Sequence, residues 1–125
     1  MRWTGPLESA ALLTVLPMPA RAASSTQGVL PWAPLVGVLL GGVAAGVAVL
    51  GDRWASPLVG AVLAVAVLAA LTRGLHLDGL ADTADGLGPL RERERALAVM
   101  HQGDVGPFGV VTLVLTLLLQ VACLA

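Results

Sequence analysis

The long uncharged stretches of this chain limit what it can fold into more than any other feature. Val29–Leu50 runs for 22 residues and Val105–Ala125 for 21 without an acidic or basic side chain. About 20 apolar residues in a helix cross the hydrocarbon core of a bilayer, and a helix satisfies its own backbone hydrogen bonds there. The two stretches therefore predict transmembrane helices at 29–50 and 105–125.

A third, shorter span is predicted at 54–71, where 18 uncharged residues follow one another. Trp54 suits the membrane interface, and Pro57 is tolerated in a first helical turn. Gly51-Asp52-Arg53 between the first two spans predicts a tight polar turn, and hence a helical hairpin. We expect an all-α, polytopic membrane protein with about three transmembrane helices in a single membrane domain over residues 1–125.

The N-terminal segment 1–28 is predicted to hold an interfacial or re-entrant helix. Its apolar stretch, Leu7–Pro19, is too short to cross a bilayer and is interrupted by Glu8. A cleaved signal peptide is the alternative, since Met1-Arg2 precedes the stretch and Ala20-Arg21-Ala22 resembles a cleavage site. Glu8 and the two late prolines, Pro17 and Pro19, argue against it.

The arginines predict the orientation of the chain in the membrane. With three spans, six of the seven lie on one side and Arg53 alone on the other. By the positive-inside rule, the N-terminus and the segment 72–104 face the cytoplasm. The six are Arg2, Arg21, Arg73, Arg91, Arg93 and Arg95.

Segment 72–104 holds the chemistry that the sequence predicts. On a helix, Asp78, Asp82 and Asp85 project at about 0°, 40° and −20°, one narrow stripe opposite the apolar side chains. This spacing predicts a cytoplasmic acidic amphipathic helix. Like charges at this spacing destabilise a helix, so we expect a cation to offset them. Mg²⁺ suits the stripe best, because it takes carboxylate oxygens, waters and substrate phosphates. The alternative is a solvated acidic face on which Asp78 caps the helix.

Residues beside the stripe complete the predicted site. Arg73 precedes it and suits a phosphate, although an interfacial anchor is an equal alternative. His76 is two residues from the first acid and is a candidate proton acceptor, against a purely structural role. Gly79 and Gly86 flank the stripe without side chains, which would let a phosphorylated ligand approach the backbone.

Other classes of site lack their usual residues. His76 and His101 are 25 positions apart and Cys123 is the single cysteine, so no zinc spacing exists. The net charge of −1 and the lack of a basic patch with aromatics give nucleic-acid binding no support. Two sets of glycines leave alternatives open. Gly37, Gly41, Gly42 and Gly46 predict close packing on another helix or reflect membrane composition. Gly103, Gly106 and Gly109 predict either a backbone wall for a ligand or a helix start.

The run from Thr72 to Gly86 closely resembles the signature of the cobalamin (5′-phosphate) synthase family, the adenosylcobinamide-GDP ribazoletransferases. Secondary resemblances lie at 13–19, 34–37 and 100–109, in the order of the family. Gln102 and Gly103 replace an acid and a serine that many members carry, and Val15 replaces a frequent arginine. The chain resembles the front half of a family whose members are about twice as long.

The resemblance implies a Mg²⁺-dependent enzyme of the bacterial inner membrane. It would join adenosylcobinamide-GDP to α-ribazole or its 5′-phosphate and release GMP. Asp78, Asp82 and Asp85 would hold the metal, His76 or an acid such as Asp82 would take the proton, and Arg73, Gly79 and Gly86 would bind substrate. Its partners would be the lipid bilayer and a further copy or a second chain supplying the missing helices.

Two alternatives remain. CDP-alcohol phosphotransferases also cluster aspartates on membrane helices, but there an alanine-arginine pair follows Asp-Gly, and here Asp82 stands in the place of that arginine. The other alternative is a non-catalytic membrane fragment or accessory subunit, in which the acids are only a surface.

Overall fold

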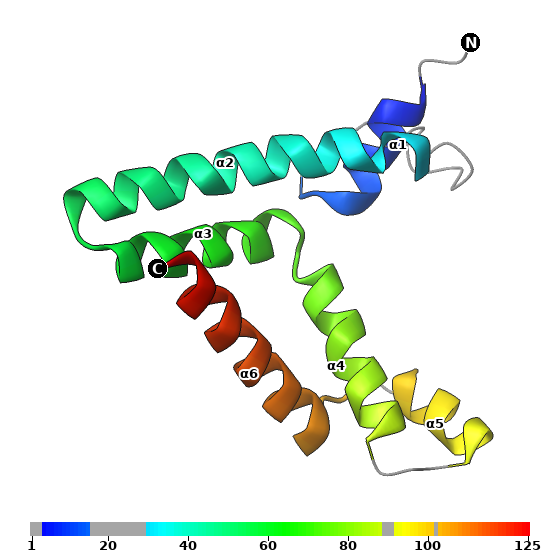
Figure 1. Ribbon diagram of the computed structural model, residues 1–125. Helices are drawn as coiled ribbons and strands as arrows, with labels where there is room; N and C mark the ends of the chain where they lie inside the picture. Colours follow the sequence, from blue (N-terminus) through cyan, green and yellow to red (C-terminus); the bar gives the residue numbers. More distant parts are fainter. Residues whose placement is uncertain (1–3, 16–29, 89–91, 102) are drawn as a thin grey trace. The chain divides into compact units, whose positions relative to one another are not determined.

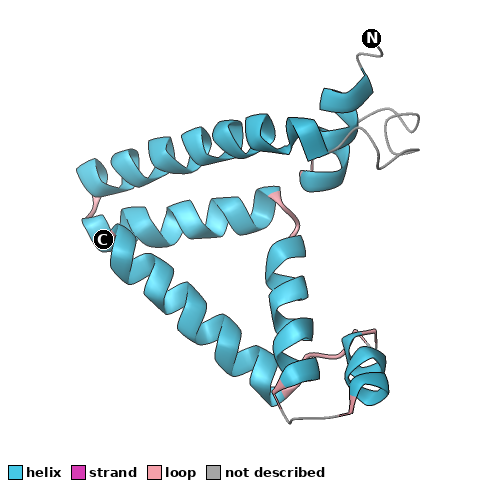
Figure 2. Cartoon of the chain, turned by 45° about the vertical axis from the view of Figure 1, so that its right-hand side comes forward, coloured by secondary structure: helices cyan, strands magenta, loops and turns pink. Residues whose placement is uncertain are grey.

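The computed structural model describes residues 4–15, 30–88, 92–101 and 103–125, and throughout these ranges all regular secondary structure is helical (Figure 2). The all-α prediction is confirmed. The predicted cleavage site at 20–22 and Arg91 lie outside the described residues. The chain forms two compact units, residues 1–73 with Ala125 and residues 74–124, and each is described by itself. That residues 1–125 make one membrane domain stays a prediction.

Four helical elements are described in the first unit, and each has a proline within its first turn. They are α1 (Thr4–Leu13), the 3₁₀ helix η2 (Leu30–Trp32), α2 (Ala33–Trp54) and α3 (Pro57–Leu71). Proline is well tolerated in a first turn, because its missing N–H would have no helical acceptor there. At the start of α3, the Ser56 Oγ accepts a hydrogen bond from the Val59 N–H at 3.3 Å.

A hairpin of α2 and α3 confirms the predicted pairing, with the two helices side by side in Figure 1. Its turn falls at Ala55 and Ser56, whose N–H groups both donate to the Gly51 carbonyl. The prediction of a turn at 51–53 was wrong, because those residues continue α2 to Trp54. The helix ends where Pro57 forces the preceding residue out of helical conformation, and Ser56 is extended with φ −166° and ψ 161°.

Small residues allow the two helices of the hairpin to approach closely. A Cβ on Gly60 would overlap the Ala48 carbonyl oxygen and lie 2.9 Å from the Asp52 nitrogen. A Cβ on Gly51 would lie 2.6 Å from the Gly60 Cα. Ala44, Ala61 and Ala64 are buried in the same hairpin. Backbone contact at glycine therefore sets the distance between α2 and α3.

The other glycines of α2 do not contribute to this contact. Among the described residues, a Cβ on any of the four would meet nothing within 4 Å; they are Gly37, Gly41, Gly42 and Gly46. The predicted close packing of this glycine set on another helix is thus not made within the described part of the chain.

At the N-terminus, α1 packs on the beginning of α2 (Figure 1). The Val15 N–H that follows it donates to the Leu71 carbonyl at the end of α3, at 2.8 Å. Three polar side chains are buried here: Glu8, Ser9 and Thr14. A short helix within 1–28 agrees with the prediction, and its interfacial or re-entrant placement stays a prediction.

The second unit consists of α4 (Leu75–Leu87), α5 (Arg93–Met100) and α6 (Pro107–Leu124). Both α5 and α6 pack against α4 (Figure 1). Helix α4 confirms the predicted acidic amphipathic helix. It is the element on which both α5 and α6 pack.

Among the residues that the structure describes, two stretches are long and apolar enough to cross a membrane, Leu30–Trp54 and Pro107–Leu124. Their large side chains are mostly exposed, for example Val38 at 71% and Leu119 at 65%, as expected where lipid is the solvent. At 15 residues, α3 is about 22 Å long and shorter than the hydrocarbon core. It counts as a third span only together with α4, as a broken helix. The protein is a helical membrane protein with two or three spans.

The glycine contact of the hairpin makes a first prediction. We expect Gly60→Ala to lower the free energy of unfolding by about 1–3 kcal/mol, because its methyl group would overlap backbone that cannot move aside. The measurement is equilibrium unfolding in mixed micelles followed by circular dichroism. Gly42→Ala, at an open position of α2, is the control and should leave stability unchanged or raise it by up to about 1 kcal/mol. Equal effects of the two variants would contradict the proposed contact.

Candidate functional site

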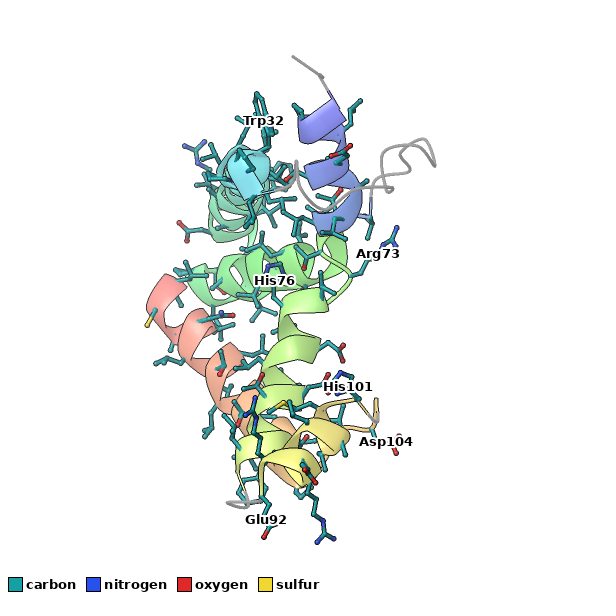
Figure 3. All side chains as sticks on the ribbon, turned by 90° about the vertical axis from the view of Figure 1, so that its right-hand side faces the viewer. Trp32, Arg73, His76, Glu92, His101 and Asp104 are labelled. Atoms are coloured by element: carbon teal, nitrogen blue, oxygen red, sulfur yellow. The ribbon has the colours of Figure 1, made fainter. Side chains whose placement is uncertain are left out.

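The backbone break before α4 ends one helix and begins the next. The Thr72 Oγ donates to the Leu68 carbonyl at 2.8 Å and the Arg73 N–H to the Ala70 carbonyl at 3.2 Å, which closes α3. Arg73 and Gly74 then both have positive φ, 55° and 67°. This conformation costs a non-glycine residue about 1–2 kcal/mol. The strained position holds Arg73 directly before the acidic helix, with its side chain exposed (Figure 3).

The three aspartates of α4 share one stripe but not one environment. Asp78 is exposed, Asp82 is half-buried, and Asp85 is only 5% exposed. Gly74 is the N-cap, and the Asp78 N–H donates to its carbonyl at 2.8 Å. The alternative in which Asp78 caps the helix was therefore wrong. Burial of the carboxylates increases from the first turn of α4 to its last.

The buried carboxylate binds the first turn of α6. The Gly106 N–H donates to the Asp85 Oδ2 at 2.7 Å, and the Gly109 N–H donates to the Asp85 Oδ1 at 2.9 Å. Each oxygen thus accepts one backbone N–H from the start of the apolar helix. The contact joins residues 21 and 24 positions apart in the sequence.

Asp85 supplies the hydrogen-bond acceptor that the residues at the start of α6 lack. The first N–H groups of a helix have no partner within it, and Ser, Thr, Asp or Asn at the N-cap usually accepts from one of them. Here Gly106 precedes Pro107 and has no side-chain oxygen. A carboxylate at a helix N-terminus also interacts favourably with the helix dipole. These charge-assisted bonds offset the cost of burying Asp85.

Glycine is required on the α6 side of this contact. A Cβ on Gly106 would lie 2.5 Å from the Asp85 Oδ1, and a Cβ on Gly109 would overlap its Oδ2. The Gly109 Cβ would also lie 3.0 Å from the carbonyl oxygen of Ala81, a fully buried residue of α4. The sequence left open whether these glycines form a backbone wall for a ligand or a helix start. Gly106 and Gly109 form a helix start, and it accommodates the Asp85 carboxylate.

The two glycines predicted to flank a ligand differ in surroundings. Gly79 is exposed, and among the described residues a Cβ there would meet nothing within 4 Å. Gly86 is buried, and a Cβ there would overlap Met100 and lie 3.2 Å from the Ala96 carbonyl oxygen of α5. The space at Gly79 is open to a ligand, whereas helix α5 fills the space at Gly86. Substrate binding at either position stays a prediction.

The two histidines lie at separate places along the second unit (Figure 3). His76 is exposed in the first turn of α4, two residues before Asp78. His101 follows α5, where its Nδ1 is 2.6 Å from the Leu97 carbonyl oxygen and closes the helix end. His101 thus lies at the end of α5, and His76 is the histidine beside the acids.

The donor set of α4 fits Mg²⁺ through two carboxylates. Within the described ranges, no three His, Cys, Asp or Glu side chains come together as a metal site. Mg²⁺ usually takes only one or two protein carboxylates and completes its shell with waters and substrate phosphates. Asp78 and Asp82, one helical turn apart and not fully buried, meet that requirement. That Asp85 is a third ligand stays a prediction.

The chain is thus a helical membrane protein with an acidic amphipathic helix, α4. This helix follows the strained backbone at Arg73, and Asp85 joins it by hydrogen bonds to the start of the apolar helix α6. The chain belongs to the cobalamin-5-phosphate synthase family, which it matches over residues 6–125.

Curated relatives agree with this assignment. The chain is 45% identical to the adenosylcobinamide-GDP ribazoletransferase of Chlorobaculum parvum, over 90% of this chain and 44% of that protein. It is 44% identical to the enzyme of that name from Thermosynechococcus vestitus, over 98% of this chain and 51% of that protein. It is 42% identical to the enzyme of that name from Rhizobium meliloti, over 98% of this chain and 49% of that protein. The chain spans about half the length of these relatives, and no solved structure matches it.

The pairing of Asp85 with the start of α6 was missed by sequence reasoning. A signal for it exists in Gly106-Pro107-Phe108-Gly109, a helix start without a capping side chain of its own. Such a start needs an acceptor from elsewhere in the fold. Its glycines at the first and fourth positions leave room for that acceptor.

The contact generates a second prediction. Gly109→Ala should lower the free energy of unfolding by about 1–3 kcal/mol, because the methyl group would overlap the Asp85 carboxylate and crowd α4. Chemical denaturation in detergent measures the change. Gly79→Ala is the matched control on the open side of α4 and should not destabilise the protein. If both variants were equally stable, α4 and α6 would not be in the contact described.

Proposed function

We propose that this chain carries the catalytic segment of a transferase that joins adenosylcobinamide-GDP to α-ribazole or its 5′-phosphate and releases GMP. This would be the last assembly step of cobalamin biosynthesis. The observation that carries the proposal is the acidic helix α4 within a chain of this family. The names of the relatives support adenosylcobinamide-GDP as the substrate, and the accessible acids of α4, Asp78 and Asp82, support phosphoryl chemistry.

In the proposed reaction, a ribose hydroxyl of the ribazole attacks the phosphorus that stays attached to cobinamide. The new P–O bond forms as the bond between that phosphorus and GMP breaks. GMP leaves with the electron pair, and the hydroxyl proton passes to a base. The protein must therefore hold a diphosphate, orient a hydroxyl and accept one proton.

Asp78 and Asp82 would hold a Mg²⁺ ion on the diphosphate. When bound, the ion supplies charge neutralisation for the departing phosphate and polarises the phosphoryl group. The carboxylates are suited to this because both remain accessible on the first two turns of α4. Gly79, between them and open, leaves the backbone accessible to a bulky phosphorylated ligand.

Arg73 would bind the reacting phosphate, and His76 would accept the proton of the attacking hydroxyl. The exposed Arg73 guanidinium is a bidentate donor for phosphate oxygens, and its backbone conformation places it immediately before α4. The exposed His76 imidazole would take the proton of the hydroxyl, with Asp82 as the alternative acceptor.

The arginine distribution supports a bacterial inner-membrane protein with this site facing the cytoplasm, where nucleotide substrates are made. The chain spans about half the length of its relatives, and we propose that helices beyond those described here complete the pocket for the corrinoid and the ribazole.

Turnover by membranes that contain this chain tests the proposed function directly. With adenosylcobinamide-GDP, α-ribazole and Mg²⁺, we expect GMP release, and a chelator should stop it. Asp82→Asn should reduce turnover by about 100-fold or more while membrane insertion is retained. Asp52→Asn, an exposed acid of α2, is the matched control and should retain activity. Undiminished turnover in Asp82→Asn would remove the metal and catalytic roles, and no GMP release at all would contradict catalysis by this chain.

The role of His76 makes a separate prediction. His76→Ala should lower kcat by about 100-fold, the usual contribution of a general base, with a smaller effect on KM. Steady-state kinetics at saturating substrate measure the split. His101→Ala removes the other histidine, which closes α5, and should retain kcat. A drop in kcat for His101→Ala but not His76→Ala would reverse the assignment.

A further inference from the structure

We infer that Asp85 is a positioning residue, which fixes the acidic helix on the start of α6 and leaves the divalent cation to Asp78 and Asp82. The inference rests on the proposed function for the metal, and it goes further by separating the three acids of one stripe into two roles. The Asp85 contact itself does not depend on that function.

Both oxygens of Asp85 are already engaged. Oδ2 accepts from the Gly106 N–H and Oδ1 from the Gly109 N–H, and the residue as a whole is 5% exposed. Mg²⁺ gives up its waters reluctantly and usually keeps several. A buried carboxylate with a backbone donor on each oxygen offers such a hydrated ion no open face. Each oxygen keeps a second lone pair, but burial gives a hydrated ion no access to it, so Asp85 would have to turn out of this contact and weaken its bonds to α6 to become a ligand.

The charges agree with this division. The N-terminus of a helix carries about half a positive elementary charge, so α6 partly neutralises Asp85. The accessible pair, Asp78 and Asp82, then carries two negative charges, which one divalent cation balances. The repulsion expected along a stripe of three acids is thus relieved at one end by a helix and at the other by an ion.

Asp85 can position Asp82 because they lie on the same face of α4, three residues apart. The anchored carboxylate fixes the rotation of α4 about its axis relative to α6. Gly106 and Gly109, which have no Cβ, let the helix approach closely enough for both hydrogen bonds. A disturbance at Asp85 therefore changes where α4 presents Asp78 and Asp82, and leaves the spacing of these two acids along the helix intact.

The first experiment uses the wild-type chain in detergent without substrate, and follows amide hydrogen exchange at Gly106 and Gly109 with and without Mg²⁺. If Asp85 is a positioning residue, both amides are protected and stay protected at saturating Mg²⁺. Loss of protection as the ion binds would overturn the inference, because the carboxylate would then have left α6 for the metal.

Two isosteric variants separate the roles in the second experiment, with Mn²⁺ titrated by electron paramagnetic resonance. Asp85→Asn should raise exchange at one or both amides by about 10-fold or more, because the carboxamide offers one acceptor where two are needed. It should change Mn²⁺ affinity by less than about 3-fold. Asp82→Asn should do the reverse. It should lower the affinity for Mn²⁺ by about 10-fold or more and leave amide exchange at Gly106 and Gly109 unchanged. Equal loss of Mn²⁺ affinity in both variants would overturn the inference.

Gly106→Ala is a further check that removes no carboxylate. It should reproduce the faster exchange of Asp85→Asn at Gly109, and reduce kcat with little change in Mn²⁺ affinity; protection equal to wild type would count against the contact. If the wild-type chain binds no Mn²⁺, the metal part of the proposed function fails. Exchange in Asp85→Asn still decides the present inference, faster exchange supporting it and unchanged exchange overturning it.

Discussion

The second unit depends on one buried carboxylate at the beginning of a helix. Asp85 accepts hydrogen bonds from Gly106 and Gly109, and so supplies α6 with the cap that its own sequence lacks. Without these bonds, a buried charge and two unpaired amides would remain, each costing about 1–3 kcal/mol or more. With them, an acidic helix and an apolar helix are joined at a defined point. The position of Asp78 and Asp82 follows from that junction.

Glycine serves three purposes in this chain, and composition alone does not distinguish them. Gly51 and Gly60 let two helices of the hairpin touch through their backbones, and Gly106 and Gly109 make room for a carboxylate. Gly74 allows a left-handed residue where α3 ends and α4 begins. In the described part of the chain the buried residues are mainly alanine, glycine and small polar groups, so its helices rely on close backbone approach, because few of its large side chains are buried.

The fold could be predicted where the signal is local. The lengths of the uncharged stretches predicted α2 and α6, and the spacing of the acids predicted α4, since each depends on neighbours within a few turns. The turn at 51–53 was wrong because polar residues can continue a helix until Pro57 ends it. The environment of Asp85 could not be predicted from periodicity, since its partners lie 21 and 24 residues away. Gly86 was likewise placed beside a ligand because the sequence does not show that α5 packs there.

On a helical wheel, the three aspartates of this apolar chain resemble a metal site with three ligands. A wheel, however, shows only the direction in which each side chain projects. Burial separates the members: the exposed Asp78 and half-buried Asp82 are open to an ion, and Asp85 faces the interior of the unit. The strained conformation of Arg73 lies at the open end of the same helix, where backbone strain is often retained for function. The helix is therefore anchored at its C-terminal end and accessible at its N-terminal end. That polarity explains how one acidic helix can hold the second unit together through Asp85 and still leave Asp78 and Asp82 accessible.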